Sequence, residues 1–167
     1  MLAGYKTIFV NCNLSESMLY FFTAAGKKKR TAGGDGRKTG TFPRFLIQSM
    51  GNLKKGACQF SFTHSGNMAA CGFSSQPIGI DAEQMTSCTE QMAHLVFSQE
   101  EMIRWKLFPD EYWRNRYFVE LWTRKESILK KKGLGFYGDL KNCQAEQAAL
   151  KTWWLESYCL SVCSSGD

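Results

Sequence analysis

We expect an α+β fold, and the sequence patterns indicate both kinds of element: the clearest strand patterns come before the clearest helix patterns along the chain. Residues 59–62 and 78–83 alternate apolar and polar side chains, as half-buried strands do, and residues 68–73 form an apolar run between them. Two stretches between residues 98 and 132 instead carry helix-start and helix-end signals. Residues 158–163 alternate again and predict a closing strand. A length of 167 residues suffices for one compact unit of this class.

The first 58 residues carry weaker patterns. Residues 7–10 predict a strand, residues 15–25 a short helix and residues 42–50 a second helix. Between the two predicted helices, residues 26–40 are rich in Lys, Arg and Gly and contain almost no apolar side chain. This composition is typical of a mobile surface loop, and we refer to residues 26–40 as the basic loop.

A hairpin and a further strand are predicted next. Turn residues at 65–67 separate two apolar runs and predict the hairpin, and residues 74–77 supply another turn. In the strand that follows, apolar positions 78, 80 and 82 share one face. Asp81 and Glu83 therefore project from the opposite face, so that two carboxylates lie on the same side of one strand.

The two helices are marked by their ends. Ser98 is predicted to cap the first helix, with Glu101 reaching back to the Ser98 backbone as in a capping box. The second helix is predicted from about residue 110 to residue 132, where a glycine follows. A spacing of four residues places Glu126 and Lys130 on one line of that helix.

Charge is unevenly distributed along the chain. Residues 1–80 hold 10 Lys/Arg and 2 Asp/Glu, a net charge of +8, whereas residues 81–167 hold 11 and 13, a net charge of −2. A basic half suits a phosphate-rich small molecule, a nucleic acid or an acidic protein. Charge alone does not choose among these partners.

Composition argues against several classes of protein. The longest early apolar stretch, residues 18–25, is much shorter than the roughly 20 residues of a membrane helix, and no signal segment opens the chain, so we expect a cytoplasmic protein. The 7 cysteines form no CxxC pair, which argues against a disulfide framework or a structural zinc site. With 2 histidines, a histidine-rich metal site is also excluded. A hard cation bound by carboxylates is left.

Asp81 and Glu83 are the first candidates for chemistry. Two carboxylates on one strand face repel each other and favour a compensating cation, most naturally Mg²⁺, which prefers oxygen ligands and leaves positions open for phosphate. The alternative is an ordinary polar strand face in water, because short motifs often match by chance. Glu126 and Lys130 add a third ligand and a phosphate-neutralising cation, or form a plain surface pair worth ~0.3 kcal/mol.

The remaining candidates have plain structural explanations of their own. Glu101 completes a capping box, which explains its position without catalysis. His64 lies at the end of the hairpin beside Thr63, where an imidazole and a hydroxyl could hold a phosphate or be merely solvated. In the basic loop, Lys28 and Arg30 are candidates for nucleotide contacts, although charge runs are usually solvated surface.

Order and spacing turn these separate features into one pattern. Along the chain stand F-T-H-S-G at residues 62–66, G-I-D-A-E at 79–83, F-S-Q-E-E at 97–101 and W-T-R-K-E-S-I-L-K at 122–130. They resemble the signatures S-H-S-G, G-[IV]-D-x-E, F-[SA]-x-x-E and W-x-x-K-E-[SA]-x-x-K of the 4′-phosphopantetheinyl transferases. The resemblance is to the single-chain, surfactin-synthetase-activating type, good from about residue 59 to residue 135 and again at residues 150–163.

The resemblance implies two similar α/β halves related by a pseudo-twofold axis, with coenzyme A in the cleft between them. We expect residues 1–75 to form an abbreviated N-terminal half with the basic loop, and residues 76–167 to form the half with the metal and catalytic motifs. The first 58 residues lack the family's G-K-P element and its helix rich in Arg and Leu. This departure weakens the predicted coenzyme A site but leaves the metal site intact.

The resemblance also implies roles for individual residues. Asp81, Glu83 and Glu126 match the family's Mg²⁺ ligands, and Lys130 matches the lysine that contacts the phosphates of coenzyme A. The other matches are Thr63 and His64 with the positions that hold its 3′-phosphate, Glu101 with the acidic residue of the third motif, and Trp122 and Lys125 with residues that support the site. Lys28 or Arg30 would replace the missing nucleotide contacts.

The expected activity is Mg²⁺-dependent transfer of the 4′-phosphopantetheine arm of coenzyme A to a serine of an acyl or peptidyl carrier protein, with release of 3′,5′-ADP. Lys130 would offset charge in the transition state, and either Glu126 or a metal-bound water would take the serine proton. We expect a monomer whose partner is an apo carrier protein. The alternatives are a non-catalytic descendant that only binds a partner, a nucleic-acid-binding module and a Mg²⁺-dependent nuclease. No RNA or DNA motif supports the nucleic-acid-binding module, and a nuclease leaves the long-helix motif unexplained.

Overall fold

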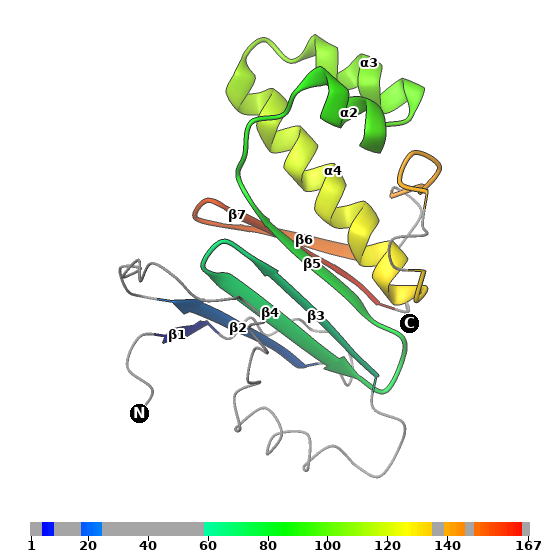
Figure 1. Cartoon of the computed structure of the whole chain (residues 1–167). Coiled ribbons are helices and arrows are strands. Elements are labelled where there is room, and N and C mark those ends of the chain that lie inside the picture. The colour runs from blue at the N-terminus through cyan, green and yellow to red at the C-terminus, as the bar shows by residue number, and fades with distance from the viewer. Residues whose placement is uncertain (1–4, 9–17, 25–58, 135–138, 146–148, 165–167) are drawn as a thin grey trace, which may run out of the picture.

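The computed structural model describes residues 5–8, 18–24, 59–134, 139–145 and 149–164 (Figure 1). The helix predicted at residues 42–50 and the basic loop, with Lys28 and Arg30, lie outside these ranges. Within them the chain is α+β, as predicted, with strands in two antiparallel sheets and three helices. None of these helices combines the length and apolar character that a membrane-spanning segment requires.

The first sheet has the order β1-β2-β4-β3 and the second the order β5-β7-β6. The strands of the first sheet are β1 (Tyr5–Ile8), β2 (Met18–Ala24), β3 (Gln59–Ser65) and β4 (Met68–Ser74). Those of the second are β5 (Gly79–Gln84), β6 (Leu150–Leu155) and β7 (Tyr158–Cys163). The helices are α2 (Glu90–Val96), α3 (Gln99–Leu107) and α4 (Glu111–Lys131).

β2 shows that the helix predicted at residues 15–25 was wrong. Residues 18–24 pair with β1 at one edge and with β4 at the other, so they form an inner strand. An inner strand can be a continuous apolar run, which periodicity does not distinguish from a buried helix. The aromatic residues at 20–22 and the threonine at 23 favour the strand. The strand predicted at residues 7–10 is found at Tyr5–Ile8.

The predicted hairpin is confirmed as β3 and β4. Ser65 pairs with Met68, so that two residues, Gly66 and Asn67, make the turn. Gly66 has a φ of +54°, a left-handed conformation that favours glycine. A Cβ atom at Gly66 would also lie 2.8 Å from the hydroxyl oxygen of Tyr158, so the turn packs closely on the second sheet.

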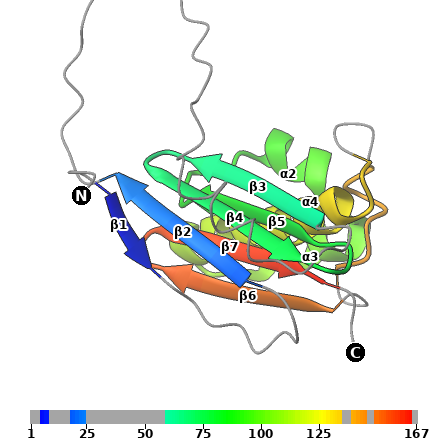
Figure 2. The ribbon, with the colours of Figure 1, turned by 90° about the horizontal axis from the view of Figure 1, so that it is seen from below.

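β5 lies between the first sheet and α4 and contacts both (Figure 1). Its apolar face packs on β4 and β7 in a cluster of buried residues, as the alternation predicted; the members are Met68, Ala70, Ile78, Ile80, Ala82, Leu160 and Val162. Its other face meets α4. Figure 2 shows the strands of both sheets from below, with the helices behind them. Asp81 and Glu83 therefore lie between a sheet and a helix.

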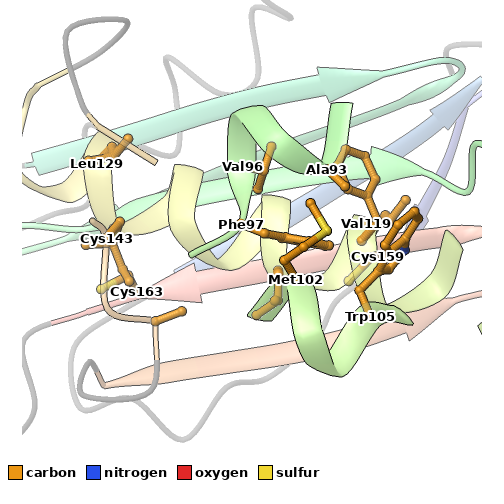
Figure 3. Packing of buried hydrophobic residues seen from close by; sticks show 14 residues of the cluster. Ala93, Val96, Phe97, Met102, Trp105, Val119, Leu129, Cys143, Cys159 and Cys163 are labelled. Atoms are coloured by element: carbon orange, nitrogen blue, oxygen red, sulfur yellow. The ribbon is translucent and has the colours of Figure 1, made fainter. Parts of the chain in front are cut away.

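A larger core lies between the helices and the α4 side of the second sheet (Figure 3). Its centre is Phe97, whose ring meets the rings of Trp105, Tyr117 and Phe118 at centroid distances of 5.6–6.2 Å. Aromatic rings at these distances pack favourably edge to face. The core thus fixes α3 and α4 against each other and holds α4 on the sheet.

The helix ends follow the predicted chemistry. The capping box of α3 is confirmed, because the Ser98 hydroxyl accepts from the Glu101 N–H and the Glu101 carboxylate accepts from the Ser98 N–H. Asp110 caps α4, which ends just before Gly133 at a φ of +69°. α2 was not predicted, and Thr89 is its N-cap. The division at residue 75 and the pseudo-twofold axis stay predictions.

Candidate functional site

The site begins where β5 crosses α4 at Gly79. A Cβ atom at Gly79 would lie 1.8 Å from the Ser127 carbonyl oxygen and 2.5 Å from the Lys131 backbone nitrogen. Only glycine allows two backbones to approach this closely. Because β5 touches α4 here, the side chains that follow on the same strand face, at positions 81 and 83, meet the helix.

Asp81 is the most buried carboxylate of the site, with 4% of its surface exposed. Its Oδ1 atom accepts hydrogen bonds from Lys130 Nζ at 2.6 Å and from Thr63 Oγ1 at 3.0 Å. Its Oδ2 atom is buried and has no hydrogen-bond partner among the described residues. Burial raises the pKa of Asp81, although the charge and hydrogen bond of Lys130 oppose this shift. The face of β5 that carries Asp81 is thus buried and is not a polar strand face exposed to water.

Glu83 and Glu126 complete a group of three interacting carboxylates. Burial is the main cause that raises the pKa of Glu83, against the hydrogen bond from Ser65, and the charge of Asp81 raises it further. Burial also raises the pKa of Glu126, and the charges of Asp81 and Glu83 add to this. Glu83 therefore feels the charge of Asp81, and Glu126 feels the charges of both. The carboxylate of Glu126 has no hydrogen-bond partner among the described residues.

The donor set fits a hard divalent cation in kind. Three neighbouring carboxylates and the buried, unused Oδ2 atom of Asp81 are oxygen donors of the kind that Mg²⁺ prefers. Across the described ranges, however, no three His, Cys, Asp or Glu side chains stand in the arrangement of a metal site. In this structure the ammonium group of Lys130 supplies the positive charge at Asp81.

Lys130 was predicted to contact coenzyme A phosphates, with a plain pair to Glu126 as the alternative. In the structure its ammonium group pairs with Asp81 across the β5–α4 contact, and contact with coenzyme A phosphates stays a prediction. A lysine ammonium group has three donor hydrogens, and one of them serves Asp81. The pairing thus joins α4 to β5 and leaves donors for phosphate oxygens.

Glu101 lies in a different environment from the three carboxylates. Its Oε2 atom accepts from Lys125 Nζ at 2.5 Å and from the Ser98 N–H at 2.8 Å. Lys125 is fully buried and also donates to the Val96 carbonyl oxygen at 2.8 Å. These contacts tie the start of α3 and the end of α2 to the middle of α4. They support the structural explanation of Glu101, and a catalytic role stays a prediction.

Two hollows adjoin these groups. A cleft of about 470 Å³ lies between the start of α3 and residues 141–145, and Glu101 lines it. A smaller, mostly apolar hollow of about 140 Å³ borders Glu83 and is lined by Met92, Phe118 and Trp122. The smaller hollow provides room next to Glu83 and α4, whereas the larger cleft lies at Glu101, away from the three carboxylates.

Thr63 and His64 lie at the same crossing but face opposite ways. Thr63 is buried, and its hydroxyl donates to Asp81 and accepts from the Ala82 N–H at 3.3 Å. His64 is exposed, and its charge acts to lower the pKa of Glu83. Binding of the 3′-phosphate by either residue stays a prediction, and Thr63 already uses its hydroxyl.

The sequence reasoning missed two contributors to the site. One is Gly79, which was noted only as part of a motif and proves to set the β5–α4 distance. The other is Ser65, whose hydroxyl donates to Glu83 Oε2 at 2.6 Å. Hydroxyl residues at every second position of a strand, here 61, 63 and 65, mark a buried polar face and could have indicated this contact.

Comparison with known proteins identifies the relatives of this arrangement. A model of the 4′-phosphopantetheinyl transferase superfamily matches residues 77–164, which include β5, α4 and β7. The chain is 40% identical over 76 residues to 4′-phosphopantetheinyl transferase Sfp of Bacillus subtilis strain 168, covering 46% of this chain and 34% of that protein. It is 37% identical over 79 residues to 4′-phosphopantetheinyl transferase HetI of Nostoc sp., covering 46% and 33%.

A third relative, 4′-phosphopantetheinyl transferase gsp of Aneurinibacillus migulanus, is 35% identical over 78 residues, covering 47% of this chain and 32% of that protein. The chain thus spans about a third of the length of the curated relatives that it matches. The matched family model covers more than half of the chain and contains the three carboxylates and Lys130. The chain therefore belongs to the 4′-phosphopantetheinyl transferase superfamily.

Proposed function

We propose that this chain transfers the 4′-phosphopantetheine arm of coenzyme A to a serine of an acyl or peptidyl carrier protein, with Mg²⁺ as cofactor. The observation that carries the proposal is the crowding of Asp81, Glu83 and Glu126 beside Lys130 at the β5–α4 crossing. Such a set suits a ligand that combines a hard cation with phosphate groups. Membership of the superfamily supplies the substrate class.

In the proposed reaction the serine oxygen forms a bond to the β-phosphorus of coenzyme A. The bond from that phosphorus to the bridging oxygen breaks, and 3′,5′-ADP leaves with this oxygen. Glu126 is a candidate acceptor for the serine proton, because its carboxylate lies beside Asp81, Glu83 and Lys130. Lys130 offsets charge on the phosphoryl oxygens with the donors that Asp81 does not use. Bound Mg²⁺ would neutralise charge on the pyrophosphate.

Binding and orientation make up the rest of the proposed mechanism. Little covalent chemistry falls to the protein in phosphoryl transfer, so positioning and charge neutralisation dominate. The basic N-terminal half suits an acidic carrier protein, and association should weaken with salt.

Mass spectrometry of an apo carrier protein incubated with the chain, coenzyme A and Mg²⁺ tests the proposal. We expect the mass of one phosphopantetheine arm to be added, and Asp81→Asn and Glu126→Gln to slow the addition by about 10²-fold or more. Glu90→Gln is the matched control, because Glu90 is an exposed carboxylate on α2 that pairs with Lys106. Addition at the control rate by both site variants would contradict the proposal.

A second candidate is a non-catalytic descendant that only binds a partner. One observation favours it: among the described residues, no three His, Cys, Asp or Glu side chains stand in the arrangement of a metal site. Calorimetry separates the two candidates. The enzyme should bind coenzyme A more tightly with Mg²⁺ than without it, whereas the absence of binding at millimolar coenzyme A would favour the descendant.

A further inference from the structure

A ladder of hydroxyl groups joins the two sheets at the site. The side chains of Ser61, Thr63 and Ser65 on β3 accept hydrogen bonds from the backbone N–H groups of Ile80, Ala82 and Gln84 on β5, at 2.9, 3.3 and 3.0 Å. β3 and β5 belong to different sheets. The hydroxyls therefore satisfy N–H groups at the edge of β5 that is not paired with β7.

Two of the three hydroxyl groups also donate a hydrogen bond to a carboxylate. Thr63 Oγ1 donates to Asp81 Oδ1 at 3.0 Å, and Ser65 Oγ donates to Glu83 Oε2 at 2.6 Å. In each case the carboxylate belongs to the residue just before the N–H donor. For the third hydroxyl, that of Ser61, the donor is Ile80, and the residue before it is Gly79, which has no side chain. The same connection, from backbone N–H to hydroxyl to carboxylate, is thus made twice and interrupted once.

The direction of these bonds follows from elementary chemistry. A hydroxyl has one hydrogen and can rotate freely. When its oxygen accepts a bond from a fixed backbone N–H, the hydrogen turns toward the remaining acceptor, here a carboxylate oxygen. A hydrogen bond to an ionised acceptor is short and strong, as the 2.6 Å distance at Ser65 illustrates. The backbone of β5 thereby orients its own carboxylates through β3.

We propose that Thr63 and Ser65 are positioning residues of the cation site, which hold Asp81 and Glu83 with their free oxygens turned toward the cation. The proposal rests on the proposed function, because that function supplies the cation. Ser65 engages Oε2 of Glu83 and leaves Oε1, and Thr63 engages Oδ1 of Asp81 and leaves the buried Oδ2 without a partner. Hydrogen bonds that orient metal ligands commonly change metal affinity 10–100-fold when removed.

Direct binding of Mn²⁺, measured by calorimetry and by electron paramagnetic resonance, tests the proposal without relying on activity. We expect Ser65→Ala and Thr63→Val to weaken Mn²⁺ binding by about 10–100-fold. Ser65→Thr keeps the hydroxyl and should restore the affinity. Ser61→Ala is the matched control, because it removes the same kind of hydroxyl-to-backbone bond but faces Gly79. It should lower stability without changing Mn²⁺ affinity.

The outcomes separate the proposal from the function on which it rests. Unchanged Mn²⁺ affinity in Ser65→Ala, or equal weakening in Ser61→Ala, overturns the positioning role while the metal site stands. No Mn²⁺ binding by the unmodified chain at millimolar metal overturns both. Circular dichroism checks folding, and if Ser65→Ala does not fold, Ser65→Cys takes its place, because a thiol keeps the size but donates weakly.

Discussion

Replacing Gly79 by alanine should damage both stability and the site. The added Cβ atom would lie 1.8 Å from the Ser127 carbonyl oxygen, about 1.6 Å short of the 3.4 Å at which ordinary van der Waals contact begins. The obstructing atoms belong to the backbone of α4, which cannot rotate away as a side chain can. Overpacking of a core costs roughly 1–3 kcal/mol, and against backbone atoms we expect about 3 kcal/mol or more.

The same displacement reaches Asp81. If β5 moves away from α4 by about 1.6 Å, the 2.6 Å contact between Asp81 Oδ1 and Lys130 Nζ lengthens beyond hydrogen-bonding distance. Urea unfolding measures the free energy of unfolding, and Mn²⁺ calorimetry measures the effect on the site. We expect both the free energy of unfolding and the affinity for Mn²⁺ to fall in Gly79→Ala.

Gly133→Ala is the control for this substitution. No atom of the described residues lies within 4 Å of a Cβ atom there, but the φ of +69° strains any other residue. Left-handed backbone costs about 1–2 kcal/mol, so Gly133→Ala should destabilise less and leave Mn²⁺ binding unchanged. If Gly79→Ala unfolds at the same urea concentration as the unmodified chain, or is more stable than Gly133→Ala, β5 and α4 do not touch as described.

Three further predictions concern charges and thiols. Burial and the charges of Asp81 and Glu83 raise the folded-state pKa of Glu126 above its unfolded value, so the ionised carboxylate lowers stability at neutral pH. In the absence of metal, Glu126→Gln should therefore be more stable than the unmodified chain at pH 7.5. This gain in the free energy of unfolding should vanish as the pH falls through the folded-state pKa of Glu126. Lys125→Met should lower the free energy of unfolding by about 3–5 kcal/mol in urea titrations, because it leaves the Glu101 carboxylate without its cation; an unchanged midpoint would contradict this. Burial raises the pKa of Cys159 to about 12, so native protein at pH 8 should leave this thiol unalkylated by iodoacetamide in peptide mass spectra, and rapid labelling would show that it is accessible.

Local chemistry explains what the sequence predicted well. The Ser98 capping box, the Asp110–Gly133 limits of the long helix and the alternation of β5 depend on neighbouring residues only, and all are found. The two carboxylates on one strand face follow from the same alternation. Their meeting with Glu126 and Lys130 was predicted through the family resemblance, because four-residue spacing alone does not say which strand a helix crosses.

The errors and omissions have a common physical origin in tertiary structure. The apolar run at Met18–Ala24 becomes a strand because β1 and β4 flank it, which its own periodicity does not reveal. Ser65 and Thr63 act on β5 through the contact between two sheets, so their acceptors cannot be assigned from spacing. Lys130 pairs with Asp81, 49 residues away in the chain. The short helix α2 has only seven residues and a weak apolar stripe.

The central claim is that Asp81, Glu83 and Glu126 share one divalent cation. An anomalous difference map from crystals grown with Mn²⁺ and coenzyme A measures this directly. The account predicts a peak at about 2.0–2.2 Å from oxygens of all three carboxylates, with Lys130 on a phosphate oxygen. A fully occupied peak elsewhere, or none between β5 and α4 at saturating Mn²⁺, would contradict it.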